Sequence, residues 1–254
     1  MKAVAALMLM TAVFIAAGCS KPDEPNNGGD NNGGNNNGGN GGGIINHEYV
    51  DLGLPSGTLW ATCNVGATTP EGYGDYFAWG ETDPKATYNW STYKYCKNGD
   101  GGQLTKYCYD SNCGYDGYTD TLTTLQPEDD AATANWGNEW RMPTYEEFEE
   151  LLQNTTITWK IQNGVNGVLF TALNGNSVFF PAAGSYLNGQ LYVGDGDNVS
   201  YWTSSHNYYY YHDHPNPEIG SGQAYSFGND GGFNLFYDAV RCFGSPVRPV
   251  RSTK

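Results

Sequence analysis

The chain is poor in positive charge: 12 lysine and arginine residues stand against 27 aspartate and glutamate residues, and the formal net charge is −15. Nucleic acids and anionic membrane surfaces are bound by clustered lysine and arginine, so this balance argues against both as partners. Charged residues make up only 15% of the chain, and aromatic residues make up another 15%. Such a composition is unlike that of a coiled coil or a charged disordered tail.

Motifs that carry enzyme chemistry are also missing. The sequence has no Gly-x-Ser-x-Gly, no Cys-x-x-Cys and only four histidines. Carboxylates are plentiful, but nothing singles out a pair suited to glycoside hydrolysis. We therefore expect a protein that is not an enzyme and that carries no cofactor.

The first residues have the pattern of a secretory leader. Lys2 precedes a short apolar run that ends in Ala16-Ala17-Gly18-Cys19, and this run is too short to span a bilayer. Its end resembles the bacterial lipobox, in which the cysteine is acylated, for example with palmitate. Ser20 and the acidic pair Asp23-Glu24 resemble signals that send lipoproteins to the cell outer membrane and its surface. We expect a signal peptide over 1–18, lipidation at Cys19, and a lipid-anchored, surface-exposed protein.

Residues 26–43 contain only asparagine, glycine and one aspartate. Such a segment cannot bury apolar surface, so we expect 19–43 to be a disordered, flexible tether. The remaining residues, 44–254, are enough for one domain with a sizeable core.

The domain reads as short β-like runs separated by turn residues, with no internal repeat. Four Asn-Gly pairs, at 163–164, 166–167, 174–175 and 188–189, are typical of hairpin turns. Strands are predicted over Glu48–Leu52, Leu59–Val65, Tyr76–Trp79, Val168–Ala172, Ser177–Pro181, Ser200–Ser204, Gln223–Phe227 and Val247–Arg251.

Two helices are predicted, over Pro127–Ala134 and Thr144–Gln153. Carboxylates in the first turn favour the former. Thr144 and Glu147 form a capping box for the latter, followed by an apolar stripe at Phe148, Leu151 and Leu152. The residues thus predict an α+β domain that is mostly β, with two short helices and long loops.

Several ordered blocks resemble known families. Asn138–Thr144 (NEWRMPT), with the acidic residues that follow, is similar to an element of formylglycine-generating-enzyme-like domains, a branch of the C-type-lectin-like fold. The wider frame resembles the Fibrobacter succinogenes major paralogous domain family of Bacteroidota lipoproteins. Its blocks are YVDLGLPSGTLWATCNVGA (49–67), YGDYFAWGET (73–82), PEDDAA (127–132), YWTSS (201–205) and PVRPVR (246–251).

The resemblance implies a C-type-lectin-like fold in which the amino- and carboxy-terminal strands pair and long loops carry variable surface. Formylglycine-generating enzymes use two cysteines near the end of the domain, and only Cys242 lies there. Their activity therefore does not follow from the resemblance. We expect five tryptophans to be core anchors: Trp60, Trp79, Trp136, Trp140 and Trp202. We expect Arg141 and Arg248 to pair with carboxylates such as Glu146, Asp129 or Asp130.

Six cysteines less Cys19 leave five, at 63, 96, 108, 113 and 242. An oxidising compartment favours one or two disulfides, whose connectivity the sequence leaves open. A local bridge among Cys96, Cys108 and Cys113 is one possibility. A zinc site there lacks a nearby histidine.

Two acidic, glycine-containing turns are weak calcium candidates. One contains Asp110, Asn112 and Asp116, and the other contains Asp195 and Asp197. Oxygen ligands suit Ca²⁺, although neither turn has the full EF-hand pattern, and solvated loops have the same composition. His212-Asp213-His214 is an unspecific transition-metal pattern.

His206–His214 reads HNYYYYHDH. Four adjacent tyrosines cannot all point inward from a strand, and tyrosine is the favoured residue of binding loops. We predict a surface for ligand binding or adhesion over 206–243 that recognises an extracellular protein or glycan. The predicted binding residues are His206, Tyr208, Tyr209, Tyr210, Tyr211, His212, Asn229, Asp230, Asn234 and Phe236.

The alternatives are a cell-surface coat component, a loop without a ligand, and a divergent formylglycine-generating-enzyme-like enzyme. The four residue types of 206–214 differ in the first base of one codon family. A further hypothesis is therefore that a retroelement diversifies this region.

Overall fold

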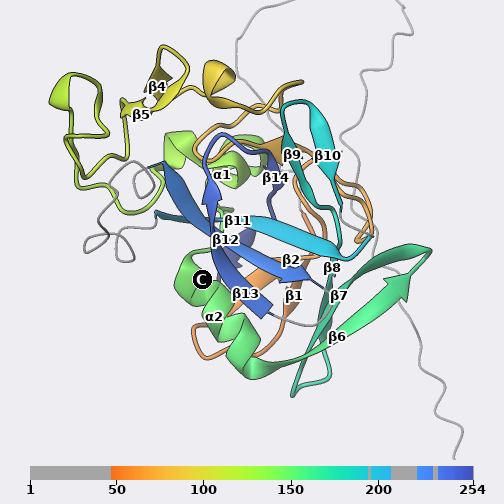
Figure 1. The fold of residues 1–254 in the computed structure, drawn as a ribbon. Coiled ribbons are helices and arrows are strands. Elements are labelled where there is room, and N and C mark those ends of the chain that lie inside the picture. The colour runs from red at the N-terminus through yellow and green to blue at the C-terminus, as the bar shows by residue number, and fades with distance from the viewer. Residues whose placement is uncertain (1–46, 194–195, 207–221, 231–233, 254) are drawn as a thin grey trace, which may run out of the picture.

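The computed structural model describes residues 47–193, 196–206, 222–230 and 234–253. This part of the chain is mostly β-sheet with two short α-helices (Figure 1), which confirms the class predicted from the sequence. The described strands form several small sheets of two or three strands.

The beginning and the end of the described chain share one sheet. Its order is β1-β2-β15, with β1 at Tyr49–Asp51, β2 at Thr58–Ala61 and β15 at Val250–Ser252. Trp60 in the central strand lies opposite Val50 on one side and Val250 on the other. All of β2 is buried, so the two ends of the domain are fixed to each other through a core strand.

Two larger antiparallel sheets follow. The first contains β6 (Thr155–Gln162), β7 (Val165–Ala172) and β8 (Ser177–Pro181), in that order. The second contains β11 (Asn198–His206), β12 (Gln223–Asp230) and β13 (Asn234–Val240). Smaller pairs are β3 (Tyr76–Phe77) with β14 (Ser245–Pro246), β4 (Cys96–Lys97) with β5 (Asp100–Leu104), and β9 (Ser185–Leu187) with β10 (Gln190–Tyr192).

The longer helix forms as its sequence predicts. α2 spans Tyr145–Asn154, and the Thr144 side chain accepts from the Glu147 backbone N–H while Glu147 accepts from the Thr144 N–H. Phe148 and Leu151 are fully buried. The first predicted helix is divided: Pro127–Asp129 is a 3₁₀ turn, and α1 runs from Ala131 to Trp136. The division occurs at Asp130, whose backbone is extended and whose side-chain carboxylate caps α1 by accepting the Thr133 N–H.

Three of the Asn-Gly pairs predicted to be turns are hairpin turns. Those at 163–164, 174–175 and 188–189 connect β6 to β7, β7 to β8, and β9 to β10. The prediction for 166–167 is wrong, because both residues lie inside β7. A Cβ at Gly167 would overlap the Phe179 ring and the Phe180 carbonyl oxygen, so glycine serves close packing there rather than a turn.

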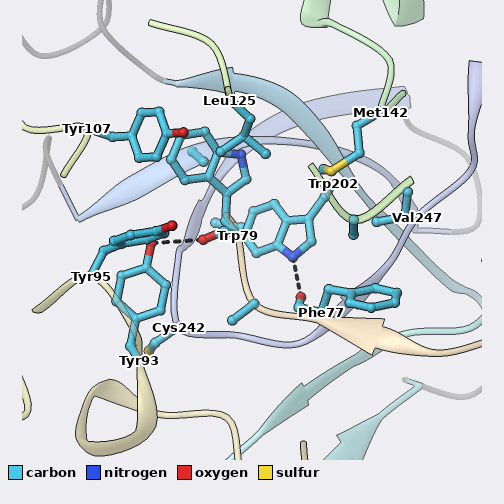
Figure 2. Packing of buried hydrophobic residues seen from close by; sticks show 14 of the residues in the cluster. Phe77, Trp79, Tyr93, Tyr95, Tyr107, Leu125, Met142, Trp202, Cys242 and Val247 are labelled. Atoms are coloured by element: carbon cyan, nitrogen blue, oxygen red, sulfur yellow. Dashed lines mark hydrogen bonds between the residues drawn. The ribbon is translucent and has the colours of Figure 1, made fainter. Parts of the chain in front are cut away.

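The core consists of two clusters of buried residues. One surrounds Trp79 and Trp202, and the other surrounds Trp60, Phe180 and Phe227. Figure 2 shows the first cluster, in which the Trp202 indole donates to the Phe77 carbonyl at 2.7 Å. The Trp79 indole donates to the Thr203 carbonyl at 2.9 Å. Trp60, Trp79, Trp140 and Trp202 are buried as predicted, and Trp136 is partly buried.

The expected partners of the two arginines need correction. Arg141 pairs with Glu147, at 2.6 Å from each carboxylate oxygen, because Arg141 lies just before α2 and Glu147 lies in its first turn. Arg248 is fully buried and pairs with no carboxylate in the described chain. It donates instead to Asn64 Oδ1 at 2.8 Å and to backbone carbonyls of Ala61, Thr62 and Phe179.

Candidate functional site

The predicted binding segment begins at His206, at one end of the β11–β12–β13 sheet. At this end β11 stops at His206, opposite Ala224 near the start of β12. We call it the loop end and define it by His206, Gly222 and Arg241. The His206 N–H donates to the Thr123 carbonyl at 2.8 Å, and the Arg241 N–H donates to the Gly222 carbonyl at 3.0 Å.

A buried arginine holds the loop end to the rest of the fold. Arg241 is fully buried, and its guanidinium carbon lies 4.9 Å from the centre of a Trp79 ring. Its side chain donates to the Lys106 and Tyr107 carbonyls and to the Gln223 carbonyl. Burial lowers the pKa of Arg241. The three backbone segments that meet here are thereby fixed in position.

His206 does not lie where an exposed binding residue should. Only 3% of it is exposed, and its ring contacts Trp79 and Tyr109 with centroid distances of 5.8 and 5.5 Å. The structure therefore places its side chain inside the fold, and a role of His206 in ligand binding stays a prediction. As the last residue of β11, it packs into the aromatic core instead.

The other predicted binding residues fall into two groups. Tyr208–Tyr211 and His212 lie outside the described residues, so their role stays a prediction. Asn229 and Asp230 belong to β12, and Asn234 and Phe236 belong to β13. Residues 229–230 and 234–236 of the predicted loop therefore belong to strands. The sequence pattern had not predicted these strand ends.

The strand residues of the second group lie at the end of the sheet opposite His206. Asp230 lies opposite Asn198 at the start of β11, whereas Ala224 lies opposite His206 at its end. Asp230 follows Ala224 by six positions along β12, a distance of about 20 Å at about 3.3 Å per residue. The described residues of the region 206–243 therefore lie at both ends of the sheet.

A half-open cavity of about 480 Å³ lies beside the loop end. Ser204 of β11 lines it, two residues before the strand stops. Apolar side chains in the lining come from Leu125, Trp140 and Met142. The other lining residues are Thr124, Pro127, Asp130, Thr133, Asn138, Arg141 and Thr144.

The charged groups of this cavity are already engaged within the fold. Burial raises the pKa of Asp130, which accepts the Thr133 and Met142 N–H groups at 2.9 and 2.8 Å. Hydrogen bonds to Glu147 raise the pKa of Arg141. Exposed polar groups remain at Thr124 and Asn138. An apolar floor with a neutral polar rim suits an amphipathic ligand group.

A buried charge cluster lies close by in sequence and was not predicted. Asp129 is 1% exposed and interacts with two lysines, Lys106 at 2.5 Å and Lys94 at 3.3 Å. The hydroxyls of Tyr95 and Tyr107 also donate to it. Burial favours a higher pKa for Asp129, but the hydrogen bonds from Lys106, Tyr95 and Tyr107 outweigh it and hold the pKa below its usual value. The sequence signal that could have found it is the lysine-tyrosine pattern at 94–95 and 106–107.

The local disulfide considered for the tyrosine-rich stretch does not form. Cys96, Cys108 and Cys113 are thiols, as is Cys242. The Cys108 thiol donates to the Asp110 carbonyl at 3.2 Å. Burial raises the pKa of Cys242 to about 12. These sulfur atoms act as small core groups.

Only some of the calcium candidates lie among the described residues. Asp110 Oδ1 accepts the Asn112 backbone N–H at 2.9 Å and its side-chain amide at 3.0 Å. Asp116 has a φ of 52° within a 3₁₀ turn, and Asp195 lies outside the described residues. Within the described part of the chain, no three His, Cys, Asp or Glu side chains gather as a metal site. Calcium binding stays a prediction.

No protein-family model matches the chain, and neither the curated proteins nor the solved structures contain a match. The family resemblance and the lectin-like fold therefore stay predictions. Among the described helices, none is both long and apolar enough to cross a membrane.

Proposed function

We propose that this chain is a lipoprotein anchored in the outer membrane and exposed at the cell surface. Its domain binds an extracellular protein or glycan without catalysing a reaction. We further propose that the domain has a C-type-lectin-like fold. The sheet shared by β1, β2 and β15, together with two short helices, supports this fold.

The observation that carries the proposal is that the cavity lies beside β11, the strand that precedes the tyrosine run in the sequence. Ser204 lines the cavity, and Tyr208 follows it by four residues. Even a fully extended chain reaches only about 13 Å over that distance. Tyr208 is therefore within about 13 Å of a residue that lines a cavity with an apolar floor, and we propose that the tyrosine run and the cavity together bind the ligand.

The rigid frame of the loop end also supports binding. Arg241, Trp79 and the backbone bonds at Thr123 and Gly222 fix both strands that carry the segment. A preorganised frame lowers the entropy lost when a ligand binds. Tyrosine adds large contact area with few rotatable bonds.

The test uses the chain from Ser20 onward on a glycan array and in pulldowns from extracellular proteins. Replacing Tyr208–Tyr211 by serine should weaken capture at least about 30-fold, the effect of losing about 2 kcal/mol at a binding hot spot. Thr124→Arg, which places a long side chain at the cavity rim, should weaken it as well.

The matched control replaces Tyr73 and Tyr192 by serine, because both are exposed and lie away from the loop end. The control should bind as the unmodified chain does. All variants should melt within a few degrees of it. Equal capture by the tyrosine variant and the unmodified chain would refute the proposal, and so would product formation from a captured ligand.

A further inference from the structure

One edge of the β6–β7–β8 sheet is open. β6 pairs with β7 along its whole length, from Thr155 opposite Ala172 to Gln162 opposite Val165. Within the described residues, no strand pairs with its other edge. Alternate residues of an edge strand direct N–H and C=O groups outward, so about four residues of β6 present unpaired backbone groups. Figure 1 shows the β6–β7 hairpin at the periphery of the molecule.

This edge has little of the protection that edge strands usually carry. Proline, bulges and charged side chains are the common devices that prevent edge-to-edge pairing. β6 contains neither proline nor a register shift, and Lys160 is its single charged residue. Thr156 and Thr158 are exposed, and Ile161 is 68% exposed.

The inner face of the strand is held firmly while the edge stays accessible. Ile157 and Trp159 are partly buried and pack against the core cluster around Trp60. Ile161 points to the same face by the two-residue alternation of a strand, but it lies beyond that core. The second half of β6 therefore has an accessible strand edge and one exposed apolar side chain, that of Ile161.

The charge distribution indicates which partner fits. The chain carries a net charge of −15, yet between Glu150 and Asp195 it contains no aspartate or glutamate. Among the described residues, two carboxylates lie at the ends of β6: Glu71 accepts from Gln162 and Asn163 at the turn, and Glu150 precedes the strand in α2. Two copies of an acidic molecule repel each other, and β6 itself has no acidic residue that adds to this repulsion.

We propose that β6 pairs antiparallel with β6 of a second copy of this chain, which joins the two three-stranded sheets into one. Such a pairing is self-complementary about a two-fold axis. When it is centred on Trp159, Ile161 faces Ile157 and Lys160 faces Thr158 of the other copy, so no like charges meet along the strands. A single strand pair buries little area, and the association is weak and concentration-dependent. This surface is separate from the loop end and does not depend on the proposed ligand.

Sedimentation of the chain from Ser20 onward tests the pairing at concentrations from about 10 µM to about 1 mM, where weak contacts become measurable. The average mass should rise toward that of a dimer. Higher salt should strengthen the association, because it screens the repulsion between two acidic molecules. Amide exchange at high concentration should slow at outward-facing residues of β6.

The edge variant combines Thr158→Lys and Ile161→Lys, which sets like charges along the facing strands and should weaken association at least about tenfold. Leu173→Lys is the matched control, since Leu173 is fully exposed at the β7–β8 turn and lies off the edge. A chain that stays monomeric throughout would overturn the proposal. Equal effects of the edge and control variants, or protection at another element, would overturn it as well.

Discussion

Replacing Asp129 by asparagine should destabilise the fold by several kcal/mol. The carboxylate is 1% exposed and accepts from Lys106 and Tyr107 on Oδ2, and from Lys94 and Tyr95 on Oδ1. An asparagine keeps the shape but turns one acceptor into a donor that faces other donors. Removing one member of a buried charge network costs about 3–5 kcal/mol. For a domain of this size, we expect a melting temperature lower by about 6–20 °C.

The neighbouring Glu128 provides the matched control. Glu128→Gln makes the same chemical change, but this side chain is 68% exposed and makes only a 3.5 Å contact with Lys106. Exposed pairs contribute about 0–1 kcal/mol, so the control should unfold at nearly the original urea concentration. A loss below about 1 kcal/mol in Asp129→Asn, or an equal loss in both variants, would refute the reasoning about burial.

The pH dependence of this difference follows from the signs of the pKa shifts. The pKa of Asp129 is lowered in the folded state, so its contribution is complete above its unfolded pKa of about 4 and is lost as the pH falls through the lower folded value. Burial and the bond to Asp129 raise the pKa of Tyr95, and burial raises that of Tyr107. Their contribution is complete below about pH 10 and is lost as the pH rises further. The difference in unfolding free energy between the two proteins should be flat from about pH 5 to about pH 9 and shrink on both sides.

Two further substitutions test local features by urea unfolding. Thr144→Ala should cost about 1 kcal/mol because α2 loses its capping box, and Thr144→Ser should restore most of it; equal midpoints for the two variants would contradict the role of the cap. Gly184→Ala should cost more than about 3 kcal/mol, because a Cβ there would overlap the Tyr192 carbonyl oxygen and the φ of 63° is unfavourable for alanine. Gly175 has a φ of 85°, but a Cβ there would meet open space, so Gly175→Ala should cost only about 1–2 kcal/mol. A similar loss of stability in the two alanine variants would show that backbone strain alone acts.

Local patterns predicted much of the secondary structure. The Thr144 and Glu147 side chains bond within one helical turn, so their spacing alone predicts the start of α2. Three Asn-Gly pairs set hairpins in the same way. β6 was missed because it follows α2 directly at Thr155, with no turn residue to mark the boundary.

The candidate site was less predictable because its contacts are long-range. Asp129 and Asp130 look like exposed first-turn carboxylates in sequence, but Lys106 and Lys94 lie 23 and 35 residues away from Asp129. His206 belongs to a run of polar and aromatic residues, and only packing against Trp79 and Tyr109 reveals that it is buried. Likewise, nothing local predicts that His206 and Asp230 lie at opposite ends of one sheet.

The sequence by itself determined the properties that depend on neighbouring residues or on composition: the predicted leader and tether, the acidic balance, the β-rich class and the capped helix. Tertiary structure alone decided which carboxylates and arginines are buried, where the cavity opens beside β11, and which strand edge is exposed. The physical reason is that burial and edge pairing depend on segments far apart in the chain, whereas capping and turn formation depend on residues within a few positions of each other.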